Sequence, residues 1–395
     1  MDFVSKQIWR SSQGEADGHF MDSDSRIRIC FVIDAIESPT AGTEKQLLLL
    51  INKLDRTCFK PYLCVLRSSN WVENELADCC LYKIGFTSFG RISAWWAIFR
   101  FSAFLRAEGV NIVQAHFRDG SIVGILAARL AGVKARVGTR RNQGYWVNSF
   151  ELVVQKILNR FTTLFVANCE NTKSWAGKTE GIVPQRIVVI PNGLEVANFQ
   201  NSSAMQRQAF RRQFGFNDNA VLVGIVANLR PVKEVDVFIE AARKVVGKNP
   251  QARFVVIGDG PEKNMLEALC RNLGLQSSIH FLGKRLDVPD ILSCLDIGVL
   301  SSGSESFSNA ILEYMAAGLA VVCTDVGGAR EAVDDGLNGF VVEPGDYCAM
   351  AERISLIIEK DLFADMGRRG REKAVSLYSH EGIVVRYQQL YKEIA

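Results

Sequence analysis

The stretch GSESFSNAILEYMAAGLAVV, residues 303–322, keeps a carboxylate in a segment that otherwise suits a protein core. Between Ser306 and Thr324, Glu313 is the only charged residue. A buried carboxylate without partners is costly, so Glu313 needs hydrogen-bond donors such as the hydroxyl groups of a sugar. The letters FSNAILEYMAAG predict a helix, because apolar residues recur at intervals of three and four along Phe307, Ala310, Ile311, Tyr314 and Met315.

A second carboxylate, Glu305, precedes the start of this predicted helix. The free N–H groups at the helix N-terminus, near Ser308 and Asn309, are suited to hold a phosphate. One carboxylate would then lie before a phosphate site and one after it. Glu305 alone is equally well explained as an ordinary charge that interacts favourably with the helix dipole.

Strand and helix patterns alternate outward from this stretch along the chain. The first strand, RIRICFVID at 26–34, enters a glycine-containing loop, and Thr43 is predicted to cap the helix TEKQLLLLINKL. This alternation predicts an α/β fold with parallel sheets covered by helices on both faces. Further strands are predicted at YLCVLR, NIVQAHF, ARVGTR, TLFVANC, RIVVIPNG, AVLVGIVANL, ARFVVIGDG, SIHFLG, IGVL, LAVVCTD and GFVVE.

The length of 395 residues exceeds what one hydrophobic core usually supports, so two domains are expected. Ligands of open α/β sheets bind at the carboxyl ends of the strands, which predicts a site in the cleft between the domains. The predicted parts are a disordered tail at 1–25, Rossmann-like domains at 26–200 and 201–377, and a helix at 378–395 that returns to the first domain.

The composition is that of a soluble globular enzyme, with 48% hydrophobic and 23% charged residues. No run reaches the roughly 18 apolar residues of a spanning helix, and residues 1–25 lack the apolar centre of a signal peptide. The ten cysteines form no CxxC pair and the four histidines lack ligand spacing. These features favour reduced thiols in a cytoplasmic protein and no metal site.

Charge is unevenly distributed along the chain. Residues 26–200 hold 22 Lys and Arg against 13 Asp and Glu, whereas residues 201–395 hold 22 against 25. A basic half suits anionic ligands or an acidic membrane face, and scattered solvated charge explains it equally well. No basic block is interleaved with aromatic residues, so nucleic acid is not predicted as a partner. The segment RISAWWAIFRFSAFLRAEG, 91–109, favours a packed helix over an interfacial membrane helix.

Two cations occupy a strand-to-helix turn in VANLRPVKEVDVFIEAARKV. Arg230 and Lys233 lie where the predicted strand ends and the helix begins. Two cations at the positive end of a helix would neutralise a diphosphate without a metal ion. Surface cations at a turn are the simpler alternative for this pair.

The combination of these segments resembles the retaining nucleotide-sugar glycosyltransferases of family 4, which have the GT-B fold. The resemblance extends over essentially residues 26–390 and implies two Rossmann-like domains that face each other across a cleft. It is carried by Glu305 and Glu313 with the following MAAGLAVVCTDVGGAREAV and DGLNGFVVEPGD, by Arg230 and Lys233, by IPNG at 190–193 and by AGTEKQ at 41–46.

The resemblance implies roles for individual residues in donor binding. The residues that match Arg230 and Lys233 bind the donor diphosphate, and the one that matches Glu313 holds the ribose hydroxyls. The residue that matches Glu305 contacts the transferred sugar. The other implied positions are the backbone around Phe307, Ser308 and Asn309 for sugar and phosphate, the main chain near Arg285 for the base, Gly42 for the diphosphate, and His116 for the sugar pocket.

The chain departs from the family pattern at three places. Ala41 precedes Gly42 where many relatives have two glycines, and Ser306 and Ser308 stand where Gly-Phe-Gly is common. Glu234 follows Lys233 where Gly or Asn is more usual. Small residues leave the backbone accessible, so we expect altered sugar selectivity rather than loss of activity, whereas Glu234 has no explanation from the sequence. A lone histidine such as His116 is, without the resemblance, more often structural.

The expected activity is transfer of a hexose from a nucleoside diphosphate sugar to an acceptor hydroxyl, with retention and without a divalent cation. A UDP-sugar is favoured as donor over GDP-mannose. Arg140 and Arg141 in GTRRNQGYW, with the aromatic segment near Trp95 and Trp96, suggest an anionic lipid-linked acceptor at the inner membrane surface. A soluble acceptor, a nucleotide-sugar epimerase of the same fold, and a binding-only protein are the alternatives.

Overall fold

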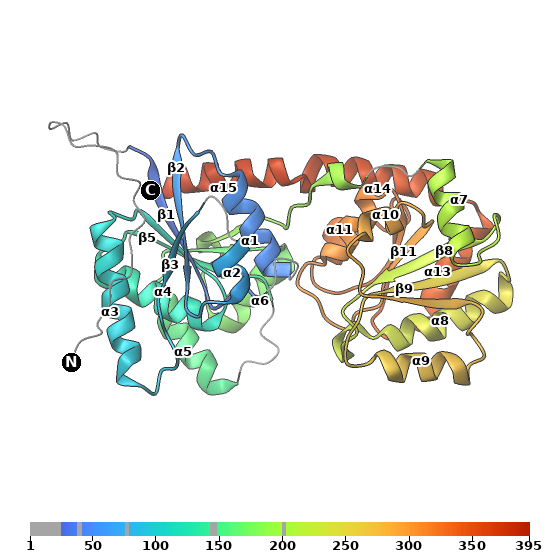
Figure 1. Ribbon diagram of the computed structural model, residues 1–395, viewed down its shortest axis with the longest axis horizontal. Helices are drawn as coiled ribbons and strands as arrows, with labels where there is room; N and C mark the ends of the chain where they lie inside the picture. Colours follow the sequence, from blue (N-terminus) through green and yellow to red (C-terminus); the bar gives the residue numbers. More distant parts are fainter. Residues whose placement is uncertain (1–24, 38–41, 76–78, 143–147, 200–202) are drawn as a thin grey trace.

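The computed structural model describes residues 25–37, 42–75, 79–142, 148–199 and 203–395. These residues form two lobes that lie side by side, with the last helices running across from the second lobe to the first (Figure 1). The predicted tail at 1–25 and the predicted domain boundary near residue 200 fall almost wholly on residues 1–24 and 200–202, outside the described residues.

The first lobe contains a seven-stranded parallel sheet, in the order β3-β2-β1-β4-β5-β6-β7. Helices α1 and α15 pack on one face, and α3 and α4 pack on the other. Because both faces are covered, strand β1 is buried along most of its length. The strands are β1 Ile27–Ile33, β2 Phe59–Val65, β3 Cys80–Lys83, β4 Ile112–Ala115, β5 Ala135–Arg140, β6 Leu164–Ala167 and β7 Ile187–Val189.

The helices of this lobe are α1 Gly42–Lys53, α2 Asn70–Glu75, α3 Ile92–Ala107, α4 Arg118–Ala131, α5 Ser149–Asn159 and α6 Glu170–Glu180. Strand β3 is absent from the sequence prediction, because its four residues lie at the sheet edge and are not fully buried, so the apolar pattern is weak. Helix α1 includes Gly42, so it begins before the predicted cap Thr43.

The second lobe contains a six-stranded parallel sheet, in the order β10-β9-β8-β11-β12-β13. All six strands correspond to predicted segments, and the two predicted parallel sheets are confirmed. The strands are β8 Val221–Val226, β9 Ala252–Ile257, β10 Ile279–Gly283, β11 Ile297–Leu300, β12 Ala320–Thr324 and β13 Gly339–Val342. The helices are α7 Ala204–Gln213, α8 Val235–Lys248, α9 Lys263–Asn272, α10 Val288–Leu292, α11 Asn309–Ala316, α12 Ala329–Ala332, α13 Tyr347–Glu359 and α14 Phe363–Tyr378.

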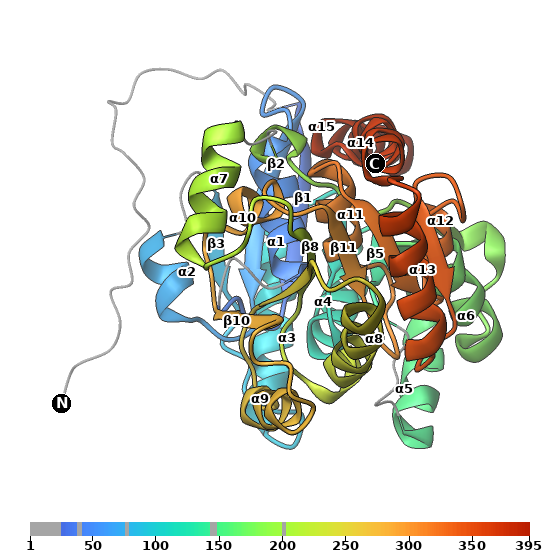
Figure 2. The same ribbon diagram turned by 90° about the vertical axis from the view of Figure 1, so that its right-hand side faces the viewer.

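Helix α15, His380–Ile394, packs on the first lobe after α14 has packed on the second. Figure 2, viewed from the side of the second lobe, shows α14 and α15 along one edge of both lobes. Tyr391 is fully buried, lies edge-on to Phe31 and Phe59, and donates a 2.7 Å hydrogen bond to Gln114 Oε1. The C-terminal helix therefore fastens the second lobe to the core of the first.

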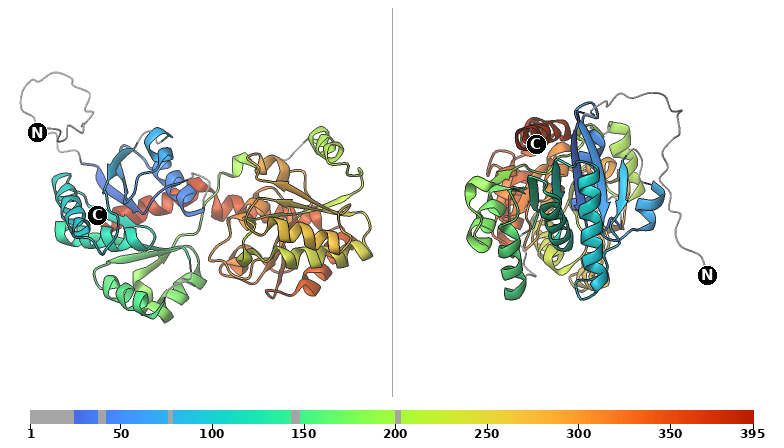
Figure 3. Two further views of the ribbon diagram at one scale, coloured as in Figure 1. Left: turned by 60° about the horizontal axis from the view of Figure 1, so that its bottom comes forward. Right: turned by 90° about the vertical axis from the view of Figure 1, so that its left-hand side faces the viewer.

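Helix α3 is a packed helix with an exposed aromatic face. Its buried side includes Ala94, Ala97, Ile98, Phe101 and Leu105. The opposite side exposes Ile92, Trp95, Trp96 and Phe99 by 79%, 54%, 67% and 55%. Figures 1 and 3 show α3 on the side of the first lobe that is farthest from the second. Within the part of the chain that the structure describes, no helix is long and apolar enough to span a membrane.

Candidate active site

A cavity of about 340 Å³ lies between the two lobes, at the carboxyl ends of their strands. It brings together eight of the residues singled out from the sequence, which are Gly42, Arg141, Lys233, Glu305, Phe307, Ser308, Asn309 and Glu313. We call it the donor cavity, after the donor-binding roles that the sequence resemblance implies for these residues. It is assembled from both lobes, and most of its charged groups lie on the second.

The N-terminus of α11 opens into the donor cavity. Ser308 is the N-cap residue, but its side chain makes no capping hydrogen bond, so the first N–H groups of the helix keep free donor capacity. Across the cavity, α1 begins at Gly42, where an added Cβ would lie 3.4 Å from the Asn309 side-chain nitrogen. Two helix N-termini thus approach one another, and both attract anions.

Glu305 is held by groups of its own lobe. Lys233 Nζ forms an ion pair with its carboxylate, and Ser302 Oγ donates a 3.0 Å hydrogen bond to it. The side chains of Glu305 and Lys233 are 16% and 25% exposed, so the pair is largely shielded from water. The ion pair therefore holds the Glu305 carboxylate beside Lys233 at the wall of the cavity.

Glu313 forms an ion pair with the first lobe. Lys45 Nζ on α1 lies 3.3 Å from Glu313 Oε1, and the glutamate side chain is 16% exposed. The next residue, Tyr314, fixes the helix: its hydroxyl accepts from Val226 N at 2.7 Å and donates to Val299 O at 3.0 Å. Burial raises the pKa of Tyr314, so the phenol stays neutral and able to donate. Glu313 therefore projects into the cleft from a rigid helix.

The IPNG segment joins the lobes at the cavity wall. Asn192 donates to Asn309 Oδ1 at 2.8 Å and to Phe307 O at 3.3 Å. Arg141 donates to Asn192 Oδ1 at 2.7 Å and to the hydroxyl of Tyr387 on α15 at 3.2 Å. The link between the lobes is thus in direct contact with the loop that precedes α11.

Four of the predicted site residues do not line the donor cavity, and one of them, Arg140, is described with the second pocket below. Arg230 is exposed at the turn after β8. Arg285 pairs with Asp287 at 2.8 and 2.5 Å and holds the pKa of that carboxyl below its usual range. His116 is 1% exposed between Gln114 and Thr139, and burial lowers its pKa to about 3, so the imidazole is neutral. His116 lines neither the donor cavity nor the second pocket described below.

Glu234 adopts a left-handed backbone conformation, with φ 43° and ψ 49°. Residues with a Cβ pay a steric cost there, which explains why glycine or asparagine is the more usual residue after the lysine. Its carboxylate lies against Gly303, so a Cβ added at that glycine would require the Glu234 side chain to move. Burial raises the pKa of Glu234, and the charge of Asp236 adds to the shift. The left-handed backbone conformation of Glu234 could not be predicted from the sequence.

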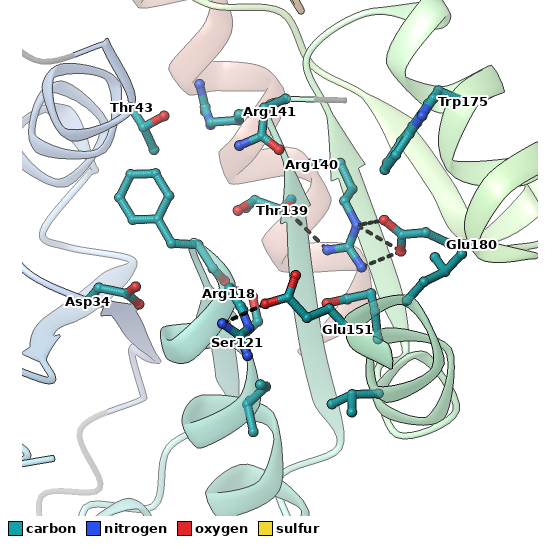
Figure 4. Close-up of a pocket in the computed structure, with 16 residues that line it drawn as sticks. Asp34, Thr43, Arg118, Ser121, Thr139, Arg140, Arg141, Glu151, Trp175 and Glu180 are labelled. Carbon is teal, nitrogen blue, oxygen red and sulfur yellow. Dashed lines mark hydrogen bonds and ion pairs between the residues drawn. The ribbon is translucent and has the colours of Figure 1, made fainter. Parts of the chain in front are cut away.

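A second pocket of about 280 Å³ lies in the first lobe, and Thr43 and Arg141 line both it and the donor cavity. We call it the first-lobe pocket. Figure 4 shows Arg118 paired with Glu151 in its wall, at 3.0 Å, with Trp175 on the opposite side. Asp34, at the end of β1, accepts a 2.5 Å hydrogen bond from Gly120 N, and burial raises its pKa to about 6.

Arg140 belongs to a buried network at one side of this pocket. Its guanidinium donates to both oxygens of Glu180, at 2.7 to 3.0 Å, and to Asn159 Oδ1 at 2.9 Å. Arg140 Nη1 donates to Thr139 O at 3.1 Å, so all three nitrogens of the guanidinium form hydrogen bonds within the protein. Both arginines proposed for an acceptor line this pocket, and Arg141 also lines the donor cavity. Sequence reasoning missed Asp34, Arg118, Glu151 and Trp175, which are scattered along the chain.

Comparison with known proteins assigns the chain to a family. Residues 40–198 match the family model described as Glycosyltransferase Family 4, and residues 206–373 match that described as Glycosyl transferases group 1. The solved structure of HepE from Anabaena in complex with UDP has the same fold, with a TM-score of 0.82 at 22% identity over 93% of this chain and all of that one. A sucrose-phosphate synthase from Thermosynechococcus elongatus aligns with a TM-score of 0.76 at 17% identity, over 93% of this chain and 99% of that one.

Curated relatives agree with this assignment. The chain is 28% identical to the UDP-Gal:alpha-D-GlcNAc-diphosphoundecaprenol alpha-1,3-galactosyltransferase of Escherichia coli, over 85% of this chain and 83% of that protein. N-acetyl-alpha-D-glucosaminyl L-malate synthase of Bacillus anthracis is 32% identical over 47% of this chain, a match that spans about half (48%) of that enzyme. The putative glycosyltransferase EpsD of Bacillus subtilis (strain 168) is 32% identical over 67% of this chain and 72% of its own length. The chain therefore belongs to glycosyltransferase family 4 and has the GT-B fold.

Proposed function

We propose that this protein transfers a hexose from a nucleoside diphosphate sugar to a hydroxyl of a lipid-linked saccharide, during assembly of an exopolysaccharide, capsule or lipopolysaccharide. A UDP-sugar is the favoured donor, and GDP-mannose is the second choice. The observation that carries the proposal is the donor cavity, where Lys233, Glu305, Glu313 and the N-terminus of α11 converge. The E. coli relative, whose name specifies a UDP-Gal donor and a diphosphoundecaprenol-linked acceptor, supports this choice.

In the proposed mechanism the protein stabilises the leaving diphosphate without a divalent cation. Lys233 and the free N–H groups of α11 offset the charge that develops as the glycosidic bond to the phosphate breaks. Glu313 accepts hydrogen bonds from the ribose hydroxyls, displacing Lys45, and Glu305 accepts from hydroxyls of the transferred sugar. The acceptor attacks from the face that the diphosphate leaves, so the anomeric configuration is retained, and the leaving phosphate takes the acceptor proton.

The first-lobe pocket is the proposed acceptor site. It adjoins the donor cavity along Thr43 and Arg141, so an acceptor hydroxyl there would be near the transferred sugar. Arg118 and Arg141 supply cations for an anionic group, and Trp175 supplies an aromatic surface for a sugar ring. Asp34 and Glu151 are acceptors for sugar hydroxyls.

We also propose that the protein is cytoplasmic and attaches peripherally to the inner membrane surface. The exposed side of α3, with Ile92, Trp95, Trp96 and Phe99, suits insertion at a lipid interface, and the basic first half of the chain suits anionic headgroups. Co-sedimentation with vesicles that contain anionic lipid tests this: the wild type should pellet, and Trp95→Ser/Trp96→Ser should stay in the supernatant. Equal pelleting of both proteins, or none by the wild type, would remove the membrane from the proposal.

A soluble, small anionic acceptor is the competing proposal, because the B. anthracis relative is named for an L-malate acceptor and the first-lobe pocket carries two arginines. One experiment decides between them. The protein is incubated with a panel of UDP- and GDP-sugars, with and without EDTA, against diphosphate-linked lipid saccharides and against soluble hydroxy acids, and products are identified by mass. The lipid-linked product, formed in EDTA, is the expected result, whereas turnover of donor without any acceptor would indicate an epimerase or hydrolase instead.

A further inference from the structure

The loop that enters α11 contains a buried hydroxyl that reaches into the other lobe. Ser306, on this loop, is 8% exposed. Its Oγ donates a 2.6 Å hydrogen bond to Asn168 Oδ1 and lies 2.6 Å from Thr172 Oγ1. Asn168 and Thr172 belong to the first lobe, where they flank the start of α6 and are 3% and 0% exposed. These contacts join the lobes at the loop that carries Glu305.

The protons of this cluster form a consistent chain. If Ser306 donates to Asn168, then Thr172 donates to Ser306. The Cys169 thiol lies 3.1 Å from both Thr172 Oγ1 and Ser306 O, and its one proton can be donated to either. Cys169 is also the N-cap of α6, since its Sγ accepts from Thr172 N at 3.3 Å. Each hydroxyl both donates and accepts, and such chains strengthen in a buried setting. A glycine at 306 would break the chain in the middle.

A second contact joins the lobes at the same helix end. Glu331 Oε1, on α12 of the second lobe, accepts from Glu170 N at 2.9 Å and Asn171 N at 3.4 Å, which are the first N–H groups of α6. The fit is close, because a Cβ added at Gly328 would lie 2.8 Å from Cys169 Cβ. Gly328 N in turn donates to Ser306 O at 2.8 Å. The N-terminus of α6 is thus occupied by the second lobe.

We propose that Ser306 is a positioning residue that couples closure of the cleft to the shape of the sugar-binding loop. Its hydroxyl ties the loop at residues 305–308 to the start of α6. The contacts of Glu305 with Lys233 and Ser302 lie within the second lobe, so docking of the lobes adds the constraint at Ser306 that fixes the shape of the rest of the loop. When the lobes separate, the buried chain of hydrogen bonds is lost and the loop relaxes. The inference rests on the proposed function for its kinetic consequence, but the contact between Ser306 and α6 stands without it.

The kinetic test uses isosteric changes on the α6 side, away from the donor. Thr172→Val removes the hydroxyl and keeps the shape, and should lower the turnover number of transfer about tenfold, the effect of one or two lost hydrogen bonds. The donor KM should change less than about twofold, because the donor contacts are untouched. Thr172→Ser restores the hydroxyl and should recover most of the rate. In combination with Ser306→Ala, Thr172→Val should cost little more than either change alone.

Hydrogen exchange supplies a readout that needs no turnover. In the wild type, the amides of 170–172 and of Gly328, which donate to Glu331 Oε1, Cys169 Sγ and Ser306 O, should exchange slowly. They should exchange faster in Thr172→Val and Ser306→Ala but not in Thr172→Ser. Thr163→Val is the control, because that hydroxyl bonds within the first lobe only. Unchanged exchange in Thr172→Val, or rate effects that simply multiply in the double variant, would overturn the inference. Absence of transfer by the wild type, with the exchange pattern as expected, would instead refute the proposed function.

Discussion

The donor cavity and the first-lobe pocket adjoin one another but are built in different ways. The charged groups of the donor cavity on the second lobe come from two short segments, 230–234 and 302–313, each of which is one turn leading into a helix. The first-lobe pocket is assembled from groups at the end of β1 and on α4, α5 and α6, with more than 140 residues of chain between the first and the last. In the proposed function, a compact motif binds the donor and a dispersed set of residues binds the acceptor.

The largest expected effect concerns the buried network at the first-lobe pocket. Glu180→Ala leaves the guanidinium of Arg140 buried and unpaired, so it should lower the free energy of unfolding by about 3 to 5 kcal/mol. Chemical denaturation of purified protein measures this. Glu372→Ala, which breaks an exposed pair on α14, is the matched control and should change stability little. A similar small effect for both variants would mean that the network does not organise the first-lobe pocket.

In the donor cavity, Lys233→Ala should lower kcat/KM for transfer by about 10²- to 10³-fold, because one preorganised charge at the leaving group is lost. Steady-state rates at several donor concentrations measure the change. Lys248→Ala, at the far end of the helix that follows, is the control and should behave as the wild type. Equal activity of Lys233→Ala and the wild type would remove the lysine from the donor site.

A change in the first-lobe pocket should separate the two substrates. Arg118→Ala is expected to raise the acceptor KM about tenfold, as one charged hydrogen bond is lost, and to leave the donor KM unchanged. Arg129→Ala, on the same helix but outside both pockets, is the comparison. A rise in the donor KM instead would place the acceptor elsewhere.

The smallest expected effect concerns Asp34. Burial raises its pKa to about 6 in the folded protein, from an ordinary value of 3.8. The unfolded chain therefore releases its proton first, and stability is lost as pH rises from about 4 through 6. Asp34→Asn should raise Tm at pH 7.5 by about 2 to 4 °C and leave it unchanged at pH 4. Differential scanning calorimetry at both pH values checks this, and a pH-independent difference would contradict the assigned shift.

The difference between the two sites also explains which features could be predicted from the sequence. The two parallel sheets followed from alternating strand and helix patterns, whereas the roles predicted for Glu305, Glu313 and Lys233 depended on the resemblance to the family, because spacing alone left them as ordinary surface charges. The partners of those residues did not, because Lys45 lies 268 positions from Glu313 along the chain. The left-handed backbone at Glu234 and the burial of His116 depend on tertiary packing, which a single sequence does not display. Arg140 looked like a free cation for the same reason, since its partner Glu180 lies 40 residues away.

The central claim is that Lys233 and the N-terminus of α11 carry a retaining transfer without a divalent cation. The most direct measurement is the NMR coupling constant of the new anomeric proton in the product. The product is made from an α-linked UDP-sugar in the presence of EDTA. The account predicts a small coupling constant, which indicates an α-linked product from an α-linked gluco- or galacto-configured donor. A β-linked product, or restoration of activity only on addition of a divalent cation, would contradict it.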